Sequence, residues 1–480
     1  MKEAAEVKPS ARQLAWYDTG FYAFVHFGVN TFTNREWGDG TEDERIFNPE
    51  KLDCDQWVSA IKSAGMKGLV LTCKHHDGFC LWPSKYTEHS VKNSPFGRDV
   101  VREASEACRR GGIRFGVYLS PWDRNSPLYG TPEYNDYFCN QLTELLTGYG
   151  EIFTVWFDNA CGEGPNGKKQ VYDFPRYIRL IRELQPNAVI FNDFGPDTRW
   201  CGNEGGIARH SEWAVVPQEL TVYAEVQSGP GPLSDRGNLS YIYSSDQEIG
   251  TMSNILFTKG LAFCPAEINM SIRPGWFWHQ EEEPHSLQRL YRTWLTSYGR
   301  NAGLNLNIPP NRDGLLDERD VRRLKEFGAL IEKEFGQPIL EIGGADIRPE
   351  TDEPMLLGDQ RKAGLVAPYQ APGSAYQPLY RLKLPRAIPQ EEIRHVTVEE
   401  EISLGQRVES FQIIACYQDG TDYPIYQGTC IGNRAICELG DPFADQNPLT
   451  DDRENHLVTD LLLKITASRG PVVLRKIAVY

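Results

Sequence analysis

Short apolar runs alternate with stretches of helical length over the first two thirds of the chain, and this alternation constrains the fold most. The strands are expected at residues 21–27, 68–73, 113–119, 152–157, 188–192 and 301–308. The helices are expected at residues 55–64, 99–110, 133–149, 177–184 and 317–335. Because the strands are almost continuously apolar, they should be buried on both faces, as in a parallel sheet covered by helices.

A closed (β/α)8-type barrel accounts for this pattern better than an open doubly wound sheet. The first strand is not followed by the glycine-rich turn that binds phosphate in open dinucleotide-binding sheets. Between residues 200 and 300 the pattern is weaker and rich in Gly, Pro and Trp. Long loops of this kind after barrel strands usually contact substrate, so we expect that role here.

The sequence pattern changes after Gly336-Gln337-Pro338, from alternating strands and helices to strands alone. Short alternating strands are expected at residues 397–402, 411–417 and 472–479, and helical periodicity is absent. A chain of 480 residues is also too long for one ordinary core. The sequence therefore predicts an α/β barrel domain over residues 1–337 and an all-β sandwich domain over residues 338–480.

Composition excludes several classes of partner. The net charge is −16 and no basic run occurs, which argues against nucleic acid. The 11 cysteines lack CxxC pairs, so neither a disulfide framework nor a zinc site is expected. No apolar window is long enough to span a bilayer. The first residues do not form a signal peptide, so we expect a cytoplasmic location, or a periplasmic or other extracytoplasmic one if a leader has been removed. The sequence does not determine the oligomeric state.

Polar residues stand at the ends of the first four strands. His26 ends the first strand, His75 and His76 follow the second, Tyr118 lies at the end of the third, and Asp158 follows the fourth. A lone Asp at such a place most often caps a turn. Since the carboxyl ends of barrel strands face one active site, these five side chains are expected to converge on one pocket.

The pair His75-His76, followed by Asp77, also allows a metal interpretation, because His and Asp are zinc ligands. We favour histidines that hydrogen-bond ligand hydroxyls, since the HxH and HExxH spacings are missing. Many tryptophans lie in loops at the same rim, where flat rings can stack on sugars. These are Trp37, Trp82, Trp122, Trp156, Trp200, Trp276 and Trp278.

Hydrolysis of a glycoside needs a second carboxyl group on another loop across the pocket. Glu204 is the first choice, because it lies in a glycine-rich loop beside Trp200 after the fifth strand. The alternatives are Glu163, Glu212, Glu225 and Glu267.

Six strings of the sequence, in order along the barrel, resemble family 29 of the glycoside hydrolases, the α-L-fucosidases. They are HFGVNTFTNREWG from His26, KHHDGFCLWPS from Lys74, GVYLSPWDRN from Gly116, VWFDNACGEG from Val155, WCGNEGGIAR from Trp200 and PAEINMSIRPGWFWH from Pro265. The motifs around Glu204 and Arg273 resemble the subfamily selective for α-1,3/1,4-linked fucose. The C-terminal sandwich is also typical of this family.

The resemblance implies a retaining mechanism with Asp158 as nucleophile and Glu204 as general acid/base. It also implies that Arg273 points into the pocket and helps to keep Asp158 ionised, while burial and the charge of Asp158 keep Glu204 protonated. Residues implied to bind the sugar are His26, Glu36, Trp37, His75, His76, Tyr118, Trp156 and Trp276. The expected ligand is a fucosylated oligosaccharide or glycan, with no cofactor and no metal.

Two alternatives remain open from the residues. One is a barrel that binds carbohydrate but has little or no catalytic activity, since a fold does not guarantee a function. The other is a metal-dependent hydrolase that uses His75 and His76.

Overall fold

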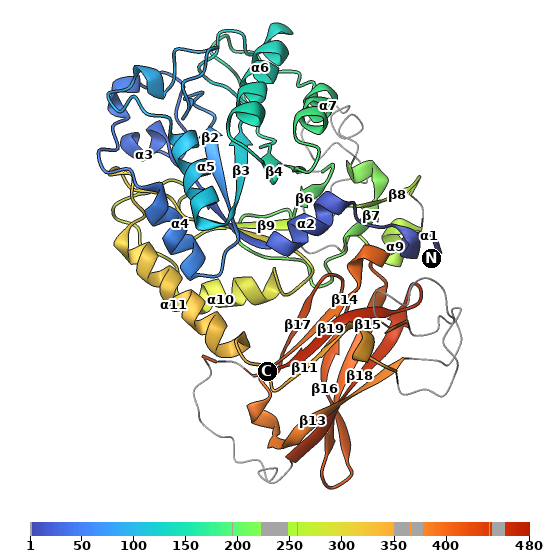
Figure 1. Ribbon diagram of the computed structural model, residues 1–480. Coiled ribbons are helices and arrows are strands. Elements are labelled where there is room, and N and C mark those ends of the chain that lie inside the picture. The colour runs from blue at the N-terminus through green and yellow to red at the C-terminus, as the bar shows by residue number, and fades with distance from the viewer. Residues whose placement is uncertain are drawn as a thin grey trace.

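The computed structural model describes residues 2–193, 195–221, 248–256, 258–349, 365–366, 378–440, 442–443 and 457–480. A helix-covered barrel forms the N-terminal part, and a β-sandwich forms the C-terminal part beside it (Figure 1). The two expected domain types are both present.

Eight parallel strands close the barrel in the order β1-β10-β9-β6-β5-β4-β3-β2. They are β1 (Phe21–Val25), β2 (Gly68–Lys74), β3 (Arg114–Leu119), β4 (Thr154–Trp156), β5 (Val189–Asn192), β6 (Thr198–Trp200), β9 (Ala266–Ser271) and β10 (Gly303–Asn307). Every residue of β1 and β2 is buried, as their continuous apolar sequences require. The (β/α)8-type barrel expected from the sequence is confirmed.

The covering helices begin where the sequence supplies capping side chains. Asp53, Asp99 and Asp317 each accept a hydrogen bond from a backbone N–H in the first turn of their helix. The longer helices are α2 (Ala11–Thr19), α4 (Cys54–Ser63), α5 (Val100–Gly111), α6 (Glu133–Gly148), α7 (Phe174–Leu184), α10 (Leu287–Thr296) and α11 (Glu318–Phe335). The short ones are α1 (Lys2–Glu6), α3 (Val29–Thr33) and α9 (Met252–Ile255).

The barrel is irregular where the sequence pattern was weak. In the described residues, no helix separates β5 from β6, and β6 is only three residues long. The segment between β6 and β9 contains two short antiparallel strands, β7 (Val215–Pro217) and β8 (Leu261–Phe263). Strands β6 and β9 were not predicted, because neither has a long apolar run.

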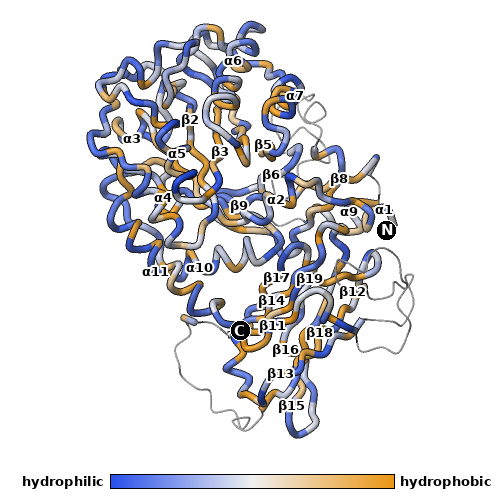
Figure 2. Tube along the Cα trace, in the orientation of Figure 1, coloured by the Kyte–Doolittle hydropathy of each residue, from blue (hydrophilic) through white to orange (hydrophobic). Residues whose placement is uncertain are grey.

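Two antiparallel sheets form the C-terminal domain. One is β11 (Leu340–Gly343), β19 (Val473–Val479), β14 (His395–Glu400) and β17 (Ala435–Glu438), with β12 (Leu365–Val366) beside β19. The other is β13 (Leu379–Pro389), β18 (Leu457–Ser468), β15 (Val408–Tyr417) and β16 (Asp422–Gly428). Val398, Ile413 and Leu463 belong to the core between them. Hydrophobic colouring follows strands of both domains, such as β3 and β14 (Figure 2).

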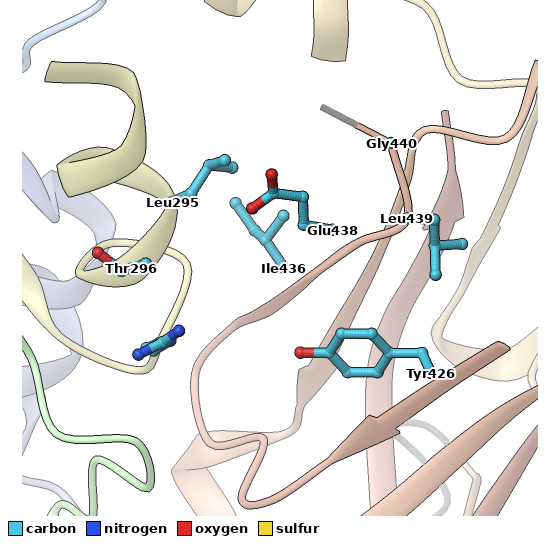
Figure 3. Close-up of a pocket in the computed structure, with 8 residues that line it drawn as sticks. Leu295, Thr296, Tyr426, Ile436, Glu438, Leu439 and Gly440 are labelled. Carbon is cyan, nitrogen blue, oxygen red and sulfur yellow. The ribbon is translucent and has the colours of Figure 1, made fainter. Parts of the chain in front are cut away.

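Helices α10 and α11 lie at the boundary with the sandwich (Figure 1). Tyr291 Oη lies 3.0 Å from His395 Nε2, and the amide of Ile436 donates to the carbonyl of Gly299 at 2.8 Å. A cavity of about 370 Å³ lies at this boundary (Figure 3). It is lined by Leu295, Thr296, Arg300, Tyr426, Ile436, Glu438, Leu439 and Gly440. None of the helices in the described ranges is both long and apolar enough to cross a membrane.

Candidate active site

A cavity of about 440 Å³ lies at the carboxyl ends of the barrel strands. Of the described residues that line it, none is Lys or Arg, which suits a neutral ligand. The lining residues are Phe24, His26, Glu36, Trp37, His75, His76, Tyr118, Trp156, Asp158, Ala160, Asp193, Trp200, Glu204, Asn269 and Trp276. The catalytic and sugar-binding residues implied by the family resemblance are all among them, with the exception of Arg273. Of the tryptophans expected at the rim, Trp82, Trp122 and Trp278 do not line the cavity.

Asp158 follows β4 directly and is held by donors from two sides. Its Oδ2 accepts a hydrogen bond from Tyr118 Oη at 3.2 Å, and its Oδ1 accepts one from the amide of Ala160 at 2.8 Å. Burial raises the pKa of Tyr118, and the charge of Asp158 raises it further, so the phenol keeps its proton and stays a donor. The side chain of Asp158 is 29% exposed, so its carboxylate is accessible from the pocket.

His26 ends β1 as a neutral side chain. Its Nδ1 lies 2.8 Å from Asn307 Oδ1, an acceptor, so Nδ1 carries the proton and Nε2 is an acceptor. Burial lowers the pKa of His26 to about 3, although the bond to Asn307 opposes this. Asn307 is itself fixed, because its Nδ2 donates to Ser271 Oγ at 2.9 Å and to the carbonyl of Trp276 at 2.7 Å.

His75 and His76 follow β2 and are also neutral, since burial lowers the pKa of both. His76 Nδ1 lies 2.7 Å from Ser120 Oγ, whose own proton goes to the carbonyl of Trp122. His76 Nε2, which lies 3.8 Å from Asp158 Oδ2, is then an acceptor. His75 Nδ1 is buried without a hydrogen-bond partner in the described part of the chain. His76 Nε2 can therefore accept a hydrogen bond from a hydroxyl group of a ligand.

The metal interpretation finds less support in this geometry. Within the described ranges, no three His, Cys, Asp or Glu side chains converge as a metal site would require. The neutral histidines instead share the pocket with aromatic rings, which is the surrounding that a sugar needs.

A buried ion pair fixes the strand end from which His75 and His76 extend. Lys74 Nζ lies 3.0 Å from Asp123 Oδ2 and 2.9 Å from Gln141 Oε1, with both charged side chains fully enclosed. The pair joins the end of β2 to α6 and to the loop after β3, and so it positions the two histidines.

Glu204 lies on the loop after β6 and reaches the same pocket. Its Oε2 accepts a hydrogen bond from Trp276 Nε1 at 3.2 Å. Burial raises the pKa of Glu204, and the charges of Asp158 and Glu36 raise it further, while the bond from Trp276 opposes them. The expectation that burial and Asp158 raise this pKa is confirmed in direction.

Three of the other glutamates considered for the second carboxyl do not line the pocket. Glu267 is buried beneath it, where it accepts from Trp156 Nε1 at 2.8 Å. Glu212 is buried against Arg199. Glu163 is exposed on the loop after β4. Glu225 lies outside the described residues.

Glu36 joins two loops across the site. Its carboxylate accepts from the amide of Trp276 at 2.8 Å, from the amide of Phe277 at 3.2 Å and from His279 Nε2 at 2.7 Å. This places the loop after β1 against the loop after β9, which carries Trp276, the residue that donates a hydrogen bond to Glu204. Glu36 therefore contributes to the shape of the pocket as well as to its lining.

Aromatic rings form an apolar wall beside Asp158. The Trp156 ring stacks on Phe191, with centroids 4.1 Å apart, and on Tyr118, with centroids 5.3 Å apart. Trp37 lies at the rim with 58% of its surface exposed and meets His76 edge-on. Such rings stack on the apolar faces of a sugar.

The prediction that Arg273 points into the pocket is wrong. Its Nε donates to both carboxylate oxygens of Asp320, at 3.0 and 2.8 Å, and its Nη2 lies 3.3 Å from Asp317. Asp317 and Asp320 stand at the start of α11, and they hold this buried guanidinium away from Asp158. Asp158 accepts its hydrogen bonds from Tyr118 Oη and the amide of Ala160 instead.

Asp193 also lines the pocket, and the sequence analysis did not identify it. It follows β5 immediately, so the rule that located Asp158 beyond β4 would have found it. Asn269 on β9 lines the pocket as well. Its Nδ2 donates to Glu267 Oε1 at 2.8 Å, which orients it at the base of the pocket.

Known proteins resemble this chain over most of its length. A family model described as alpha-L-fucosidase matches residues 4–334. The chain is 36% identical over 436 residues to Alpha-L-fucosidase 1 of Arabidopsis thaliana, an alignment that covers 89% of this chain and 81% of that protein.

Two solved structures share the fold over 99% of this chain. One is a glycoside hydrolase 29 family member from an unknown rumen bacterium, with a TM-score of 0.77 and 34% identity over 77% of that chain. The other is a GH29 fucosidase of Ruminococcus gnavus in complex with fucose, with a TM-score of 0.79 and 26% identity over 95% of that chain. The chain therefore belongs to family 29 of the glycoside hydrolases, the α-L-fucosidases.

Proposed function

We propose that the protein hydrolyses terminal α-1,3/1,4-linked L-fucose from oligosaccharides or glycans with retention of configuration. The reaction passes through a fucosyl ester on Asp158. One observation supports this most strongly: two carboxyl groups line one pocket, Asp158, which accepts hydrogen bonds from Tyr118 Oη and the amide of Ala160, and Glu204, whose pKa is raised by burial.

In the first step Glu204 donates its proton to the glycosidic oxygen while Asp158 Oδ2 attacks the anomeric carbon. The bond from that carbon to the leaving oxygen breaks, and the aglycone departs as an alcohol. In the second step the ionised Glu204 takes a proton from water, which attacks the same carbon and releases Asp158. Two inversions restore the α configuration.

The pocket also has the polarity that fucose needs. Fucose carries a methyl group at C6, and the rings of Phe24, Trp156 and Trp276 provide an apolar surface for it. The neutral acceptor nitrogens of His26 and His76 suit the hydroxyl groups.

Selectivity for α-1,3/1,4 linkages is proposed from the form of the motif around Glu204. Its test is product release from a panel of α-1,2, α-1,3, α-1,4 and α-1,6 fucosides. Release confined to branched α-1,3 and α-1,4 members supports the proposal, whereas equal rates on α-1,2 or α-1,6 members would overturn the linkage claim and leave the fucosidase activity standing.

A barrel that binds fucose without catalysis predicts saturable binding and no product with any member of the panel. Measurement of fucose binding beside turnover therefore separates these two functions. A metal-dependent hydrolase would lose its activity after extensive chelation, and the proposed mechanism would not.

A further inference from the structure

Asp193 occupies the strand end between the two proposed catalytic groups. In the barrel, β5 lies between β4 and β6. Asp158 follows β4, Asp193 follows β5 and Glu204 lies on the loop after β6, and all three line the same pocket. The topology therefore places a third carboxyl group between the nucleophile and the acid/base.

Contacts on both sides of Asp158 hold this strand end. Asn192 Nδ2 donates to the carbonyl of Phe157 at 3.5 Å. Asn159 is hydrogen-bonded to the side chain of Asp193. The residues before and after Asp158 are thus tied to the residues that end β5, so the position of Asp193 relative to the nucleophile is fixed.

The charges that act on Asp193 are both acidic, Asp158 from β4 and Glu204 from the loop after β6. Burial is the largest cause that raises the pKa of Asp193, the charges of Asp158 and Glu204 add to it, and the bond with Asn159 opposes it; together they bring the pKa to about 8. The nearby His76 is neutral and offers no compensating positive charge. At neutral pH Asp193 therefore keeps its proton.

We propose that Asp193 works as a neutral carboxylic acid that donates a hydrogen bond to a hydroxyl group of the bound sugar, beside the nucleophile. This inference rests on the proposed function, because it places a sugar in this pocket. A protonated carboxyl group is both a donor and an acceptor. It supplies a donor that the acceptor nitrogens of His26 and His76 lack, without adding a second permanent negative charge beside Asp158.

Thermal unfolding tests the protonation state without any substrate. The variant Asp193→Asn keeps the shape of the neutral acid and cannot ionise. The pKa of Asp193 is 3.8 in the unfolded chain and about 8 in the folded chain. Between these two pH values the unfolded wild type binds fewer protons than the folded wild type, so the stability of the wild type falls as pH rises. The stability of the variant does not fall for this reason, because its amide does not titrate. The Tm of Asp193→Asn minus that of wild type should therefore rise between about pH 4 and pH 8 and then level off.

Kinetics test the hydrogen-bond role. With an aryl fucoside whose leaving group needs little protonation, kcat/KM depends weakly on the proton of Glu204. We expect Asp193→Asn to stay within about 10-fold of wild type near neutral pH and to keep its rate at alkaline pH, where wild type declines. Asp193→Ala should lose about 10- to 100-fold and bind L-fucose more weakly. Glu163→Gln, an exposed acid on the neighbouring loop, is the matched control and should resemble wild type.

Two results would overturn the proposal. One is an Asp193→Asn protein as inactive at every pH as Asp158→Asn, since a carboxylate would then be required. The other is a Tm difference that does not change with pH. If wild type hydrolyses no fucoside, the proposed function fails separately, and fucose binding by the two Asp193 variants together with the unfolding curves still decides the role of Asp193.

Discussion

The active-site pocket has two walls that are built differently. The strand-end wall consists of His26, His75, His76, Tyr118 and Asp158, which lie at or just beyond the ends of β1 to β4. The loop wall consists of Glu204 and Trp276, which lie on the loops after β6 and β9 and contact each other. The sheet fixes the first wall, whereas contacts between loops fix the second.

This difference matches the chemistry proposed for each wall. Binding groups and a nucleophile must hold one geometry, and buried bonds such as His26 to Asn307 provide it. An acid/base must give and then take a proton, and Glu204 is held by one indole N–H within a glycine-rich loop. In the proposed mechanism, rigid positioning and proton transfer therefore fall to different structural elements of one barrel.

Within the strand-end wall, substitution of Asp158 should cause the largest loss of turnover. Asp158→Ala or Asp158→Asn should fold normally and lose at least about 10⁴-fold in turnover, because no other group replaces the nucleophile. Azide added to Asp158→Ala should attack the substrate directly and give a β-fucosyl azide. Wild-type-like hydrolysis of an aryl fucoside by the well-folded variant would end the assignment.

The loop wall should show a smaller effect that depends on the substrate. Glu204→Ala should lose about 10²- to 10⁴-fold on natural glycosides and much less on aryl fucosides with good leaving groups. Azide should now replace water in the second step and give an α-fucosyl azide, the opposite anomer from that of Asp158→Ala. Glu163→Gln is the control for a nearby acid that is outside the pocket.

Proton NMR of the wild-type reaction checks the stereochemistry of both walls together. The first product should be α-L-fucose, as expected when the two carboxyl groups stand about 5–5.5 Å apart in the working enzyme. An initial β-anomer would refute retention. Retention with an unimpaired Glu204→Ala would transfer the acid/base role to another carboxyl of the pocket.

The rigidity of the strand-end wall can be tested through stability. Asp123→Ala leaves the buried Lys74 ammonium without its carboxylate, which should cost about 3–5 kcal/mol of unfolding free energy in urea. The matched control is Asp55→Ala, which removes the exposed pair with Arg110 and should cost less than about 1 kcal/mol. Similar costs for the two variants would contradict the claim that the Lys74 pair supports this wall.

The smallest effect is expected within the strand-end wall at His76. His76→Ala removes an acceptor for a sugar hydroxyl and should weaken fucose binding and kcat/KM by about 10- to 100-fold. His75→Ala should behave similarly. Elemental analysis provides the check on the alternative: a stoichiometric metal lost together with activity in these variants would disprove the hydroxyl-binding role.

The strand-end wall could be predicted from the sequence because each of its residues follows an apolar run that only a buried strand explains. His75 and His76 come directly after residues 68–73, so their place at the rim required only the polarity of a parallel barrel. The same rule would have found Asp193. Asp193 directly follows the apolar run of residues 188–192.

The loop wall and the second half of the barrel could not be predicted from the local sequence pattern alone. β6 has three residues and is followed by a long irregular segment, so no periodicity marks it. Glu204 was identified through a family resemblance as much as through its place after a strand. Arg273 shows the limit of such resemblance, because its orientation depends on Asp317 and Asp320, which stand more than forty residues later in the sequence.

The buried carboxylate of Glu267 has a consequence for anyone who redesigns this barrel. It accepts hydrogen bonds from Tyr22, Trp156, Asn269 and Asn305, so four donors on different strands share one acceptor beneath the pocket. Replacing Glu267 alone with a hydrophobic residue would leave these donors unpaired and release the indole beside the nucleophile from its fixed orientation. The five residues form one hydrogen-bonded unit, and a thermostable variant or a new substrate specificity would have to exchange them as a set.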